Sequence, residues 1–191
     1  MKDSQSKHLW RETEPTMQPS GPIVIAGFMA CGKTTLASAL AGRLNCKMID
    51  LDEVITKREG RSPAEILEGD GEPAFRTIET IALHDVLKDD SVGVIALGGG
   101  AWISDANRQL IDQYASISVW LDTPFEVCWE RIALSEVVRP LGRSKEEAQK
   151  LYERRRNVYE LADLRLEAYE GVSIEKLARE IEGHVVHLKV T

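Results

Sequence analysis

Short apolar segments alternate with amphipathic segments along the chain from residue 21 onward. The apolar segments predict strands, and the 3.6-residue spacing of apolar positions between them predicts helices. The predicted strands are Ile23–Ala26, Lys47–Asp50, Val92–Leu97, Ser116–Leu121 and Leu164–Glu167. Strands that alternate with helices are typical of a parallel sheet covered by helices on both faces. We therefore expect a doubly wound α/β fold with a five-stranded parallel sheet.

Three predicted helices begin with the same pattern, a Ser or Thr followed three residues later by Glu. The three segments are 62–65 (SPAE), 123–126 (TPFE) and 144–147 (SKEE). In this pattern the hydroxyl caps the first helical turn and the Glu side chain reaches back to the cap residue. Pro63 and Pro124 stand at the expected first helical position, where the missing N–H costs nothing. A last helix is expected over about residues 173–183.

A phosphate-binding loop is the clearest motif of the chain. Residues 27–34, GFMACGKT, match the pattern GxxxxGK[ST] between a predicted strand and a predicted helix. Backbone N–H groups and the helix dipole make such a turn an anion site, Lys33 would reach the outer phosphates, and Thr34 would supply a hydroxyl to Mg²⁺. The expected ATP-binding residues of this loop are Ala30, Cys31, Gly32, Lys33, Thr34 and Thr35.

Composition narrows the class of protein. The 191 residues suit one domain, and 43% hydrophobic with 29% charged residues is ordinary for a globular protein. A net charge of −7 argues against a nucleic-acid partner. Three cysteines without close pairing indicate reduced thiols and a cytoplasmic protein, and no apolar run reaches the ~18 residues that span a membrane. Residues 1–20 are polar and read as a flexible extension rather than a signal peptide.

Further polar motifs follow the other predicted strands, and ligands of such sheets bind at the carboxyl ends of the strands. Two aspartates follow the second strand, and three glycines follow the third, where a ligand can approach backbone amides. The motifs are DLD at 50–52, GRS at 60–62, GE at 71–72, FRTIE at 75–79, GGG at 98–100, RPL at 139–141 and RRNVY at 155–159.

This ordered set of motifs resembles the shikimate kinase family over a stretch from Gly21 to about Ala178. Any one motif is weak, but six elements in register are specific: the phosphate loop, DLD, the series GRS–GE–FRTIE, GGG, RPL and RRNVY. The resemblance implies a P-loop kinase domain over residues 21–191, similar to nucleoside monophosphate kinases, with a lid at about 135–145. It implies transfer of the γ-phosphoryl group of ATP to the 3-hydroxyl of shikimate, with Mg²⁺, on the way to chorismate and the aromatic amino acids.

The resemblance also implies catalytic roles. Lys33, Asp52 and Arg139 look like the catalytic residues. Asp52 would hold two substrate hydroxyls and orient or deprotonate the attacking one, although it could instead be a helix N-cap. Asp50 would contact Mg²⁺ through water, because no Asp ends the third strand. Arg139 would close over ATP as part of the lid, the alternative being an ordinary loop arginine.

Arg76, Arg155 and Gly99 resemble the family's substrate-binding residues. The two arginines would grip the carboxylate of the acid, and Gly99 would offer its amide. Arg76 could instead pair with Glu79 on a solvent face, and a neighbour of Arg155, either Arg154 or Arg156, could take its role.

Two positions of the phosphate loop depart from the family pattern. Ala30 replaces a common glycine, which should be tolerated if its φ is negative, and Cys31 stands where Ala or Ser is more usual. Arg131 is a weaker candidate for stacking on adenine. Two other functions stay open: a P-loop kinase for another acceptor such as gluconate, and a non-catalytic nucleotide-binding module. The family implies a monomer.

Overall fold

A computed structural model describes residues 21–114, 116–135, 144–169 and 171–190, with side chains up to Val185 in the last range. The extension 1–20, Arg139 and most of the expected lid therefore lie outside the described residues.

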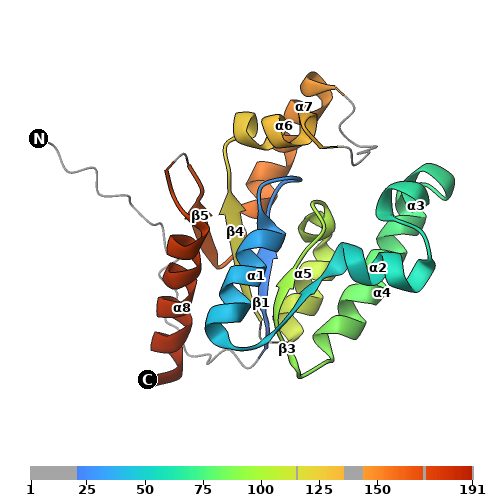
Figure 1. Ribbon diagram of the computed structural model, residues 1–191. Coiled ribbons are helices and arrows are strands. Elements are labelled where there is room, and N and C mark those ends of the chain that lie inside the picture. The colour runs from blue at the N-terminus through green and yellow to red at the C-terminus, as the bar shows by residue number, and fades with distance from the viewer. Residues whose placement is uncertain (1–20, 115, 136–143, 170, 191) are drawn as a thin grey trace, which may run out of the picture.

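A parallel sheet forms the centre of the molecule (Figure 1). In the described part of the chain its strands are β1 (Ile23–Ala26), β2 (Lys47–Asp50), β3 (Val92–Ala96), β4 (Ile117–Asp122) and β5 (Leu164–Glu167). Their order is β2-β3-β1-β4-β5, and every neighbouring pair is parallel. The predicted fold class and all five predicted strands are confirmed, with boundaries within one residue.

The apolar pattern explains the central place of β1. All four of its residues are buried, as expected for a strand covered on both faces. Ile25 pairs with Ala96 of β3, and Ala26 pairs with Trp120 of β4. These registers bring the carboxyl ends of β1, β3 and β4 to one edge of the sheet, so the segments that follow them meet there.

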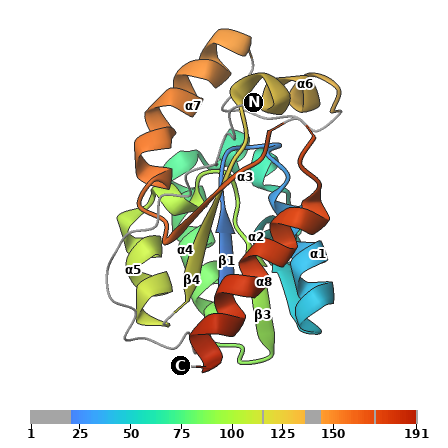
Figure 2. The same ribbon diagram turned by 90° about the vertical axis from the view of Figure 1, so that its left-hand side faces the viewer.

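Helices cover both faces of this sheet. Their bounds are α1 (Lys33–Leu44), α2 (Leu51–Glu59), α3 (Pro63–Gly69), α4 (Glu72–Leu87), α5 (Asp105–Gln113), α6 (Phe125–Ala133), α7 (Lys145–Tyr159) and α8 (Ile174–Val190), with a 3₁₀ turn η1 (Ala101–Ile103). Figure 2 shows α1 and α8 on one side of the strands and α4 and α5 on the other. The arrowheads point toward α3, α6 and α7, which surround the carboxyl edge. None of the described helices is long and apolar enough to cross a membrane.

Two of the three predicted helix starts have the expected caps. Ser62 accepts from the N–H of Glu65 and donates its own N–H to the Glu65 carboxylate at 2.7 Å, which completes a capping box. Ser144 accepts from the N–H of Glu147 at 3.2 Å.

The capping prediction at Thr123 is wrong. Pro124 is the N-cap residue of α6, and no side chain caps this helix. The Thr123 hydroxyl instead donates to the carbonyl of Cys31 at 3.0 Å. The Thr123 hydroxyl thus makes a tertiary contact with the phosphate loop in place of the helix cap that the local pattern predicts.

Candidate functional site

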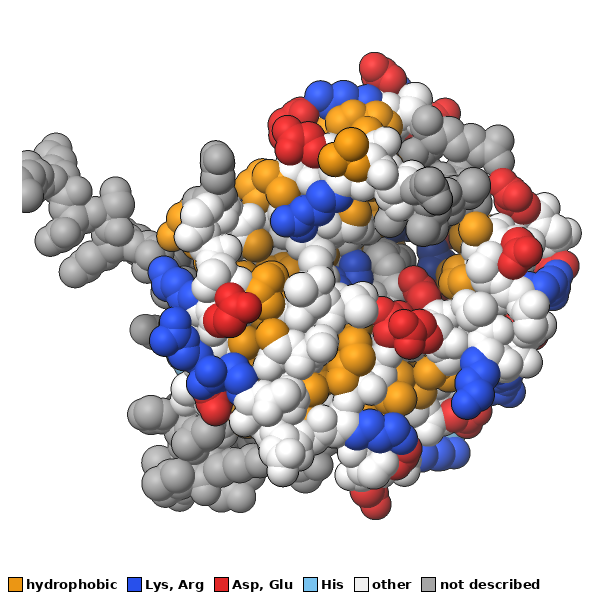
Figure 3. All heavy atoms as spheres, in the orientation of Figure 1, with side chains coloured by type: hydrophobic (Ala, Val, Ile, Leu, Met, Phe, Trp, Pro, Cys, Tyr) orange, Lys and Arg blue, Asp and Glu red, His pale blue; other side chains and the backbone are white. Residues whose placement is uncertain are grey.

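A cleft of about 900 Å³ opens at the carboxyl edge of the sheet. The phosphate loop forms one wall, and α3 with the start of α4 forms another. Figure 3 shows a hollow in which acidic and basic side chains lie close together. The expected site residues that line the cleft are Ala30, Gly32, Lys33, Thr34, Thr35, Asp50, Asp52, Arg76, Gly99 and Arg155. Cys31 does not line it, since its side chain is buried in the core.

The phosphate loop takes an unusual backbone path with three positive φ angles. These are 147° at Gly27, 58° at Ala30 and 107° at Gly32. The condition expected at Ala30, a negative φ, is therefore not met. An L-residue in the left-handed region is strained by roughly 1–2 kcal/mol, because its Cβ crowds the following carbonyl. The loop must be held in this shape by contacts with its surroundings.

Replacing Ala30 by glycine is expected to raise the free energy of unfolding by about 0.5–1 kcal/mol. The relief of strain, about 1–2 kcal/mol, exceeds the entropy lost by a more flexible unfolded chain, about 0.4–1 kcal/mol. Urea denaturation without nucleotide measures the change. The matched control is Ala39→Gly within α1, where the same substitution should cost about 1 kcal/mol. Equal destabilisation by both substitutions would show that Ala30 is not strained.

Lys33 lies within the loop rather than in solvent. Its side chain is largely buried, and Nζ donates to the carbonyls of Phe28 at 2.8 Å and Gly27 at 3.1 Å. The ammonium group is thus placed at the mouth of the anion site that the loop and the start of α1 form.

Thr34 and Asp50 come together beside the loop. The Thr34 hydroxyl donates to Asp50 Oδ2 at 2.6 Å, and Asp50 Oδ1 accepts from the N–H of Asp52 at 3.0 Å. Asp50 is therefore the N-cap of α2, and the alternative that Asp52 caps this helix is wrong. Hydroxyl and carboxylate oxygens suit Mg²⁺, which is usually held by one or two such groups with substrate phosphates and water. In the part of the chain that the structure describes, no three His, Cys, Asp or Glu side chains lie together as a metal site.

Asp52 points into the cleft from the first turn of α2. Burial raises the pKa of Asp52 above its usual value, and the charge of Asp50 raises it further, while Lys33 and Arg76 oppose the shift. A Cβ atom at Gly98 would lie 2.6 Å from Asp52 Oδ1 and 3.2 Å from Glu79 Oε1. Glycine at position 98 therefore leaves the room that these two carboxylates occupy.

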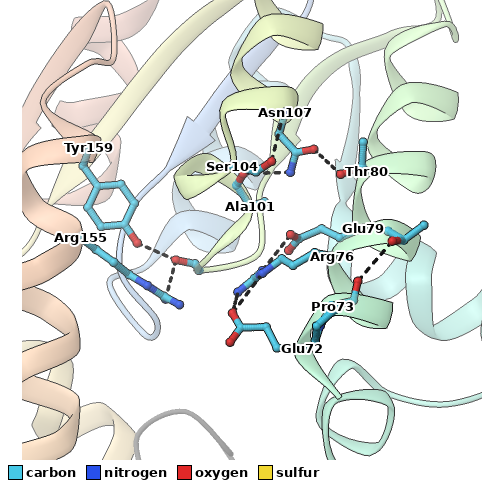
Figure 4. A network of polar contacts seen from close by, with 12 residues as sticks. Glu72, Pro73, Arg76, Glu79, Thr80, Ala101, Ser104, Asn107, Arg155 and Tyr159 are labelled. Carbon is cyan, nitrogen blue, oxygen red and sulfur yellow. Dashed lines mark hydrogen bonds and ion pairs between the residues drawn. The ribbon is translucent and has the colours of Figure 1, made fainter. Parts of the chain in front are cut away.

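Arg76 lies between two carboxylates on one face of α4 (Figure 4). Its Nη1 donates to Glu79 Oε2 at 2.8 Å, and its Nη2 donates to Glu72 Oε1 at 2.9 Å. The pair with Glu79 exists but is not on a solvent face, since the Glu79 side chain is only 1% exposed. Burial raises the pKa of Glu79 in spite of Arg76, and Glu79 Oε1 has no hydrogen-bond partner among the described residues. Sequence reasoning missed Glu72, although its i,i+4 spacing to Arg76 was a signal.

Arg155 enters the cleft from α7 on the opposite side. Its side chain is 7% exposed, and Nη1 donates to the carbonyl of Gly99 at 3.0 Å. The Tyr159 hydroxyl donates to the same carbonyl at 2.6 Å. Burial lowers the pKa of Arg155, and the charge of Arg76 adds to this effect. The more distant charge of Glu72 opposes this lowering of the Arg155 pKa.

The neighbours of Arg155 lie elsewhere. Arg154 is exposed, and Arg156 donates both Nη1 and Nη2 to the carboxylate of Asp122 at 2.8 Å. Of the three consecutive arginines, only Arg155 is among the described residues that line the cleft.

Several curated relatives of this chain are shikimate kinases. The family model for shikimate kinase matches residues 29–185. The shikimate kinase of Cereibacter sphaeroides is 40% identical over 159 residues, which cover 82% of this chain and 78% of that protein. The shikimate kinase of Aquifex aeolicus is 34% identical over 168 residues, which cover 86% of this chain and 98% of that protein.

Solved structures agree with the sequence comparisons. The shikimate kinase from Acinetobacter baumannii, solved in complex with shikimate, matches with a TM-score of 0.82 at 30% identity, over 91% of this chain and 97% of that one. A gluconokinase from Sinorhizobium meliloti matches with a TM-score of 0.63 at 16% identity, which shows a shared fold alone. The match of the family model and these relatives together show that the chain belongs to the shikimate kinase family.

Proposed function

We propose that this chain transfers the γ-phosphoryl group of ATP to the 3-hydroxyl of shikimate, giving shikimate 3-phosphate and ADP. Membership of an ATP-dependent kinase family supports this activity. The observation that carries the proposal is the position of Arg76, Arg155 and Asp52 in the same cleft as the phosphate loop. Two guanidinium groups and one carboxylate suit a small acid that bears hydroxyl groups.

Each side chain has a role that follows from its chemistry. Arg155 and Arg76 bind the carboxylate of the acid, and Glu79 fixes Arg76 from the buried side. Asp52 accepts a hydrogen bond from the attacking hydroxyl and takes its proton. Lys33 neutralises charge on the transferred phosphoryl group, because phosphoryl transfer depends chiefly on positioning and electrostatics.

Mg²⁺ fits the site as the partner of ATP. The Thr34 hydroxyl would hold it directly and Asp50 through water, and the ion would supply charge neutralisation at the phosphates. Gly99 would offer its amide to the acid, and Arg139 would close over the phosphates with the lid.

Arg76→Ala is expected to raise KM for shikimate about 10- to 100-fold while kcat changes less. A charged hydrogen bond to the substrate contributes about 1.5–3 kcal/mol, and its loss weakens binding of the acid. ADP release at saturating ATP and Mg²⁺ measures both constants. Arg58→Ala is the control, because Arg58 pairs with Asp85 away from the cleft. An unchanged KM and kcat for the Arg76 variant would rule out the carboxylate clamp.

A panel of acceptors separates the proposal from its alternatives. Shikimate, quinate, gluconate and nucleoside monophosphates are compared in the same ADP-release assay. Turnover with shikimate alone supports the proposal. Turnover with gluconate alone would keep the kinase fold and reassign the arginines, and ATP binding without any turnover would indicate a non-catalytic module.

We expect a monomer, as the family resemblance implies, with ATP and shikimate as its small-molecule partners. The absence of a close cysteine pair in the sequence supports a reducing compartment such as the cytoplasm.

A further inference from the structure

Thr123 contacts the phosphate loop and does not line the cleft. It follows β4 directly, and its side chain is buried at 2% exposure. Its hydroxyl donates to the carbonyl of Cys31 across 92 positions of sequence, at 3.0 Å. In Figures 1 and 2 the segment between β4 and α6 runs beside the loop between β1 and α1. Thr123 is absent from the described residues that line the cleft, so any effect on a bound nucleotide must pass through the loop.

Four carbonyl groups of the loop accept hydrogen bonds from side chains, namely those of Gly27, Phe28, Ala30 and Cys31. Lys33 Nζ donates to the carbonyls of Gly27 and Phe28. Arg131 Nη1 donates to the carbonyls of Ala30 at 3.1 Å and Cys31 at 3.0 Å. A loop that binds phosphate through its N–H groups must keep its carbonyl dipoles directed away from the anion. These donors hold the carbonyls in that orientation.

The strain at Ala30 explains why such donors are needed here. Ala30 has a φ of 58°. A glycine would adopt this angle without cost, whereas an alanine adopts it only with strain. A strained backbone persists only where its surroundings fix it. Arg131 donates to the carbonyls of Ala30 and Cys31, and Thr123 donates to the carbonyl of Cys31, so both donors act on the peptide planes next to the strained residue.

Thr123 is itself held in place by two helices. The Tyr152 hydroxyl of α7 donates to the carbonyl of Thr123 at 3.1 Å, and Cys128 Sγ of α6 lies 3.8 Å from the same carbonyl. The donor is therefore part of the packed end of the sheet and not a freely rotating surface hydroxyl.

We propose that Thr123 is a positioning residue for the nucleotide. Its hydroxyl fixes the peptide plane of Cys31 and thereby aims the amides of the phosphate loop at the phosphates of ATP. The inference rests on the nucleotide site of the proposed function, but it does not depend on which acceptor is phosphorylated.

The test compares Thr123→Val, which keeps the shape and removes the donor, with Thr123→Ser, which keeps the donor. Titration calorimetry with ATP and Mg²⁺ alone measures nucleotide affinity, and steady-state kinetics with shikimate gives both KM values. The valine variant should bind ATP about three- to tenfold more weakly, the range expected for one lost hydrogen bond. Its KM for shikimate should stay within about twofold, and the serine variant should bind ATP as the parent does.

Three results would overturn the proposal. These are unchanged ATP affinity in the valine variant, equal loss in the valine and serine variants, or an equal rise of both KM values. Since ATP binding is measured without an acceptor, a chain that binds ATP normally but does not phosphorylate shikimate would contradict only the proposed function.

A second variant keeps the proposal testable if the valine variant does not fold. Tyr152→Phe removes the hydroxyl that holds the Thr123 carbonyl. Circular dichroism checks the fold of each variant. The phenylalanine variant should lose ATP affinity in the same direction with KM for shikimate unchanged, and parent-like ATP affinity in this folded variant would count against the proposal.

Discussion

Replacement of Asp52 by asparagine is expected to lower kcat by about 10²–10⁴-fold, the usual contribution of a general base. The amide has nearly the same shape but cannot take the proton of the attacking hydroxyl. Burial and the charge of Asp50 raise the pKa of Asp52, so in the parent enzyme kcat/KM should fall as pH is lowered through a value above 3.8. The pH profile and single-turnover rates measure both effects.

The same substitution should not destabilise the fold. A carboxyl group with a raised folded-state pKa binds its proton more tightly in the folded chain, so its contribution to stability falls as pH rises above 3.8. Removing the charge should leave the free energy of unfolding at neutral pH equal or higher. Glu53→Gln is the control, since Glu53 is the exposed neighbour on α2. A kcat within tenfold of the parent would show that another group accepts the proton.

Lys33→Ala is expected to lower kcat by at least about 10²-fold, because a fixed positive charge at the developing phosphoryl charge is lost. The substitution also leaves the carbonyls of Gly27 and Phe28 without their side-chain donor. ATP affinity should therefore fall as well, which calorimetry measures. Lys47→Ala is the matched control. Lys47 is the first residue of β2, at the end of the strand away from the cleft, and it pairs with Asp89.

Circular dichroism separates chemistry from folding for this variant. A folded Lys33 variant with parent-like kcat would mean that Arg139 or the metal ion supplies the charge alone. A similar loss of activity in the Lys47 variant would indicate a general effect of removing a lysine.

The sheet could be predicted because its strands carry a local signal. Ile23–Ala26 is apolar at every position, and the structure buries it on both faces. The cap at Ser62 was also local, since both partners lie within three residues. Thr123 could not be predicted in this way. The same capping pattern is present, but its hydroxyl donates to the carbonyl of Cys31, 92 positions away in the sequence.

The sequence predicted which residues form the site better than it predicted their burial and backbone conformation. The motifs named Asp50 and Asp52, and the structure brings both to the cleft. No local pattern could show that Glu79 is buried, because burial depends on how α4 packs. The sign of φ at Ala30 was equally hidden, since contacts from Thr123 and Arg131 stabilise it. The role of Arg139 stays a prediction.

The central place of β1 has a consequence for motion. This strand hydrogen-bonds to neighbours on both sides, so its amide protons should exchange with solvent only when the whole domain unfolds. The short helix α3 buries only Ile66 completely among its seven residues, and its amides can exchange through local opening. The nucleotide would thus bind to a loop anchored on β1, in the slowest-exchanging part of the molecule. The acid would bind beside α3, a helix that opens locally and closes again many times between global unfolding events.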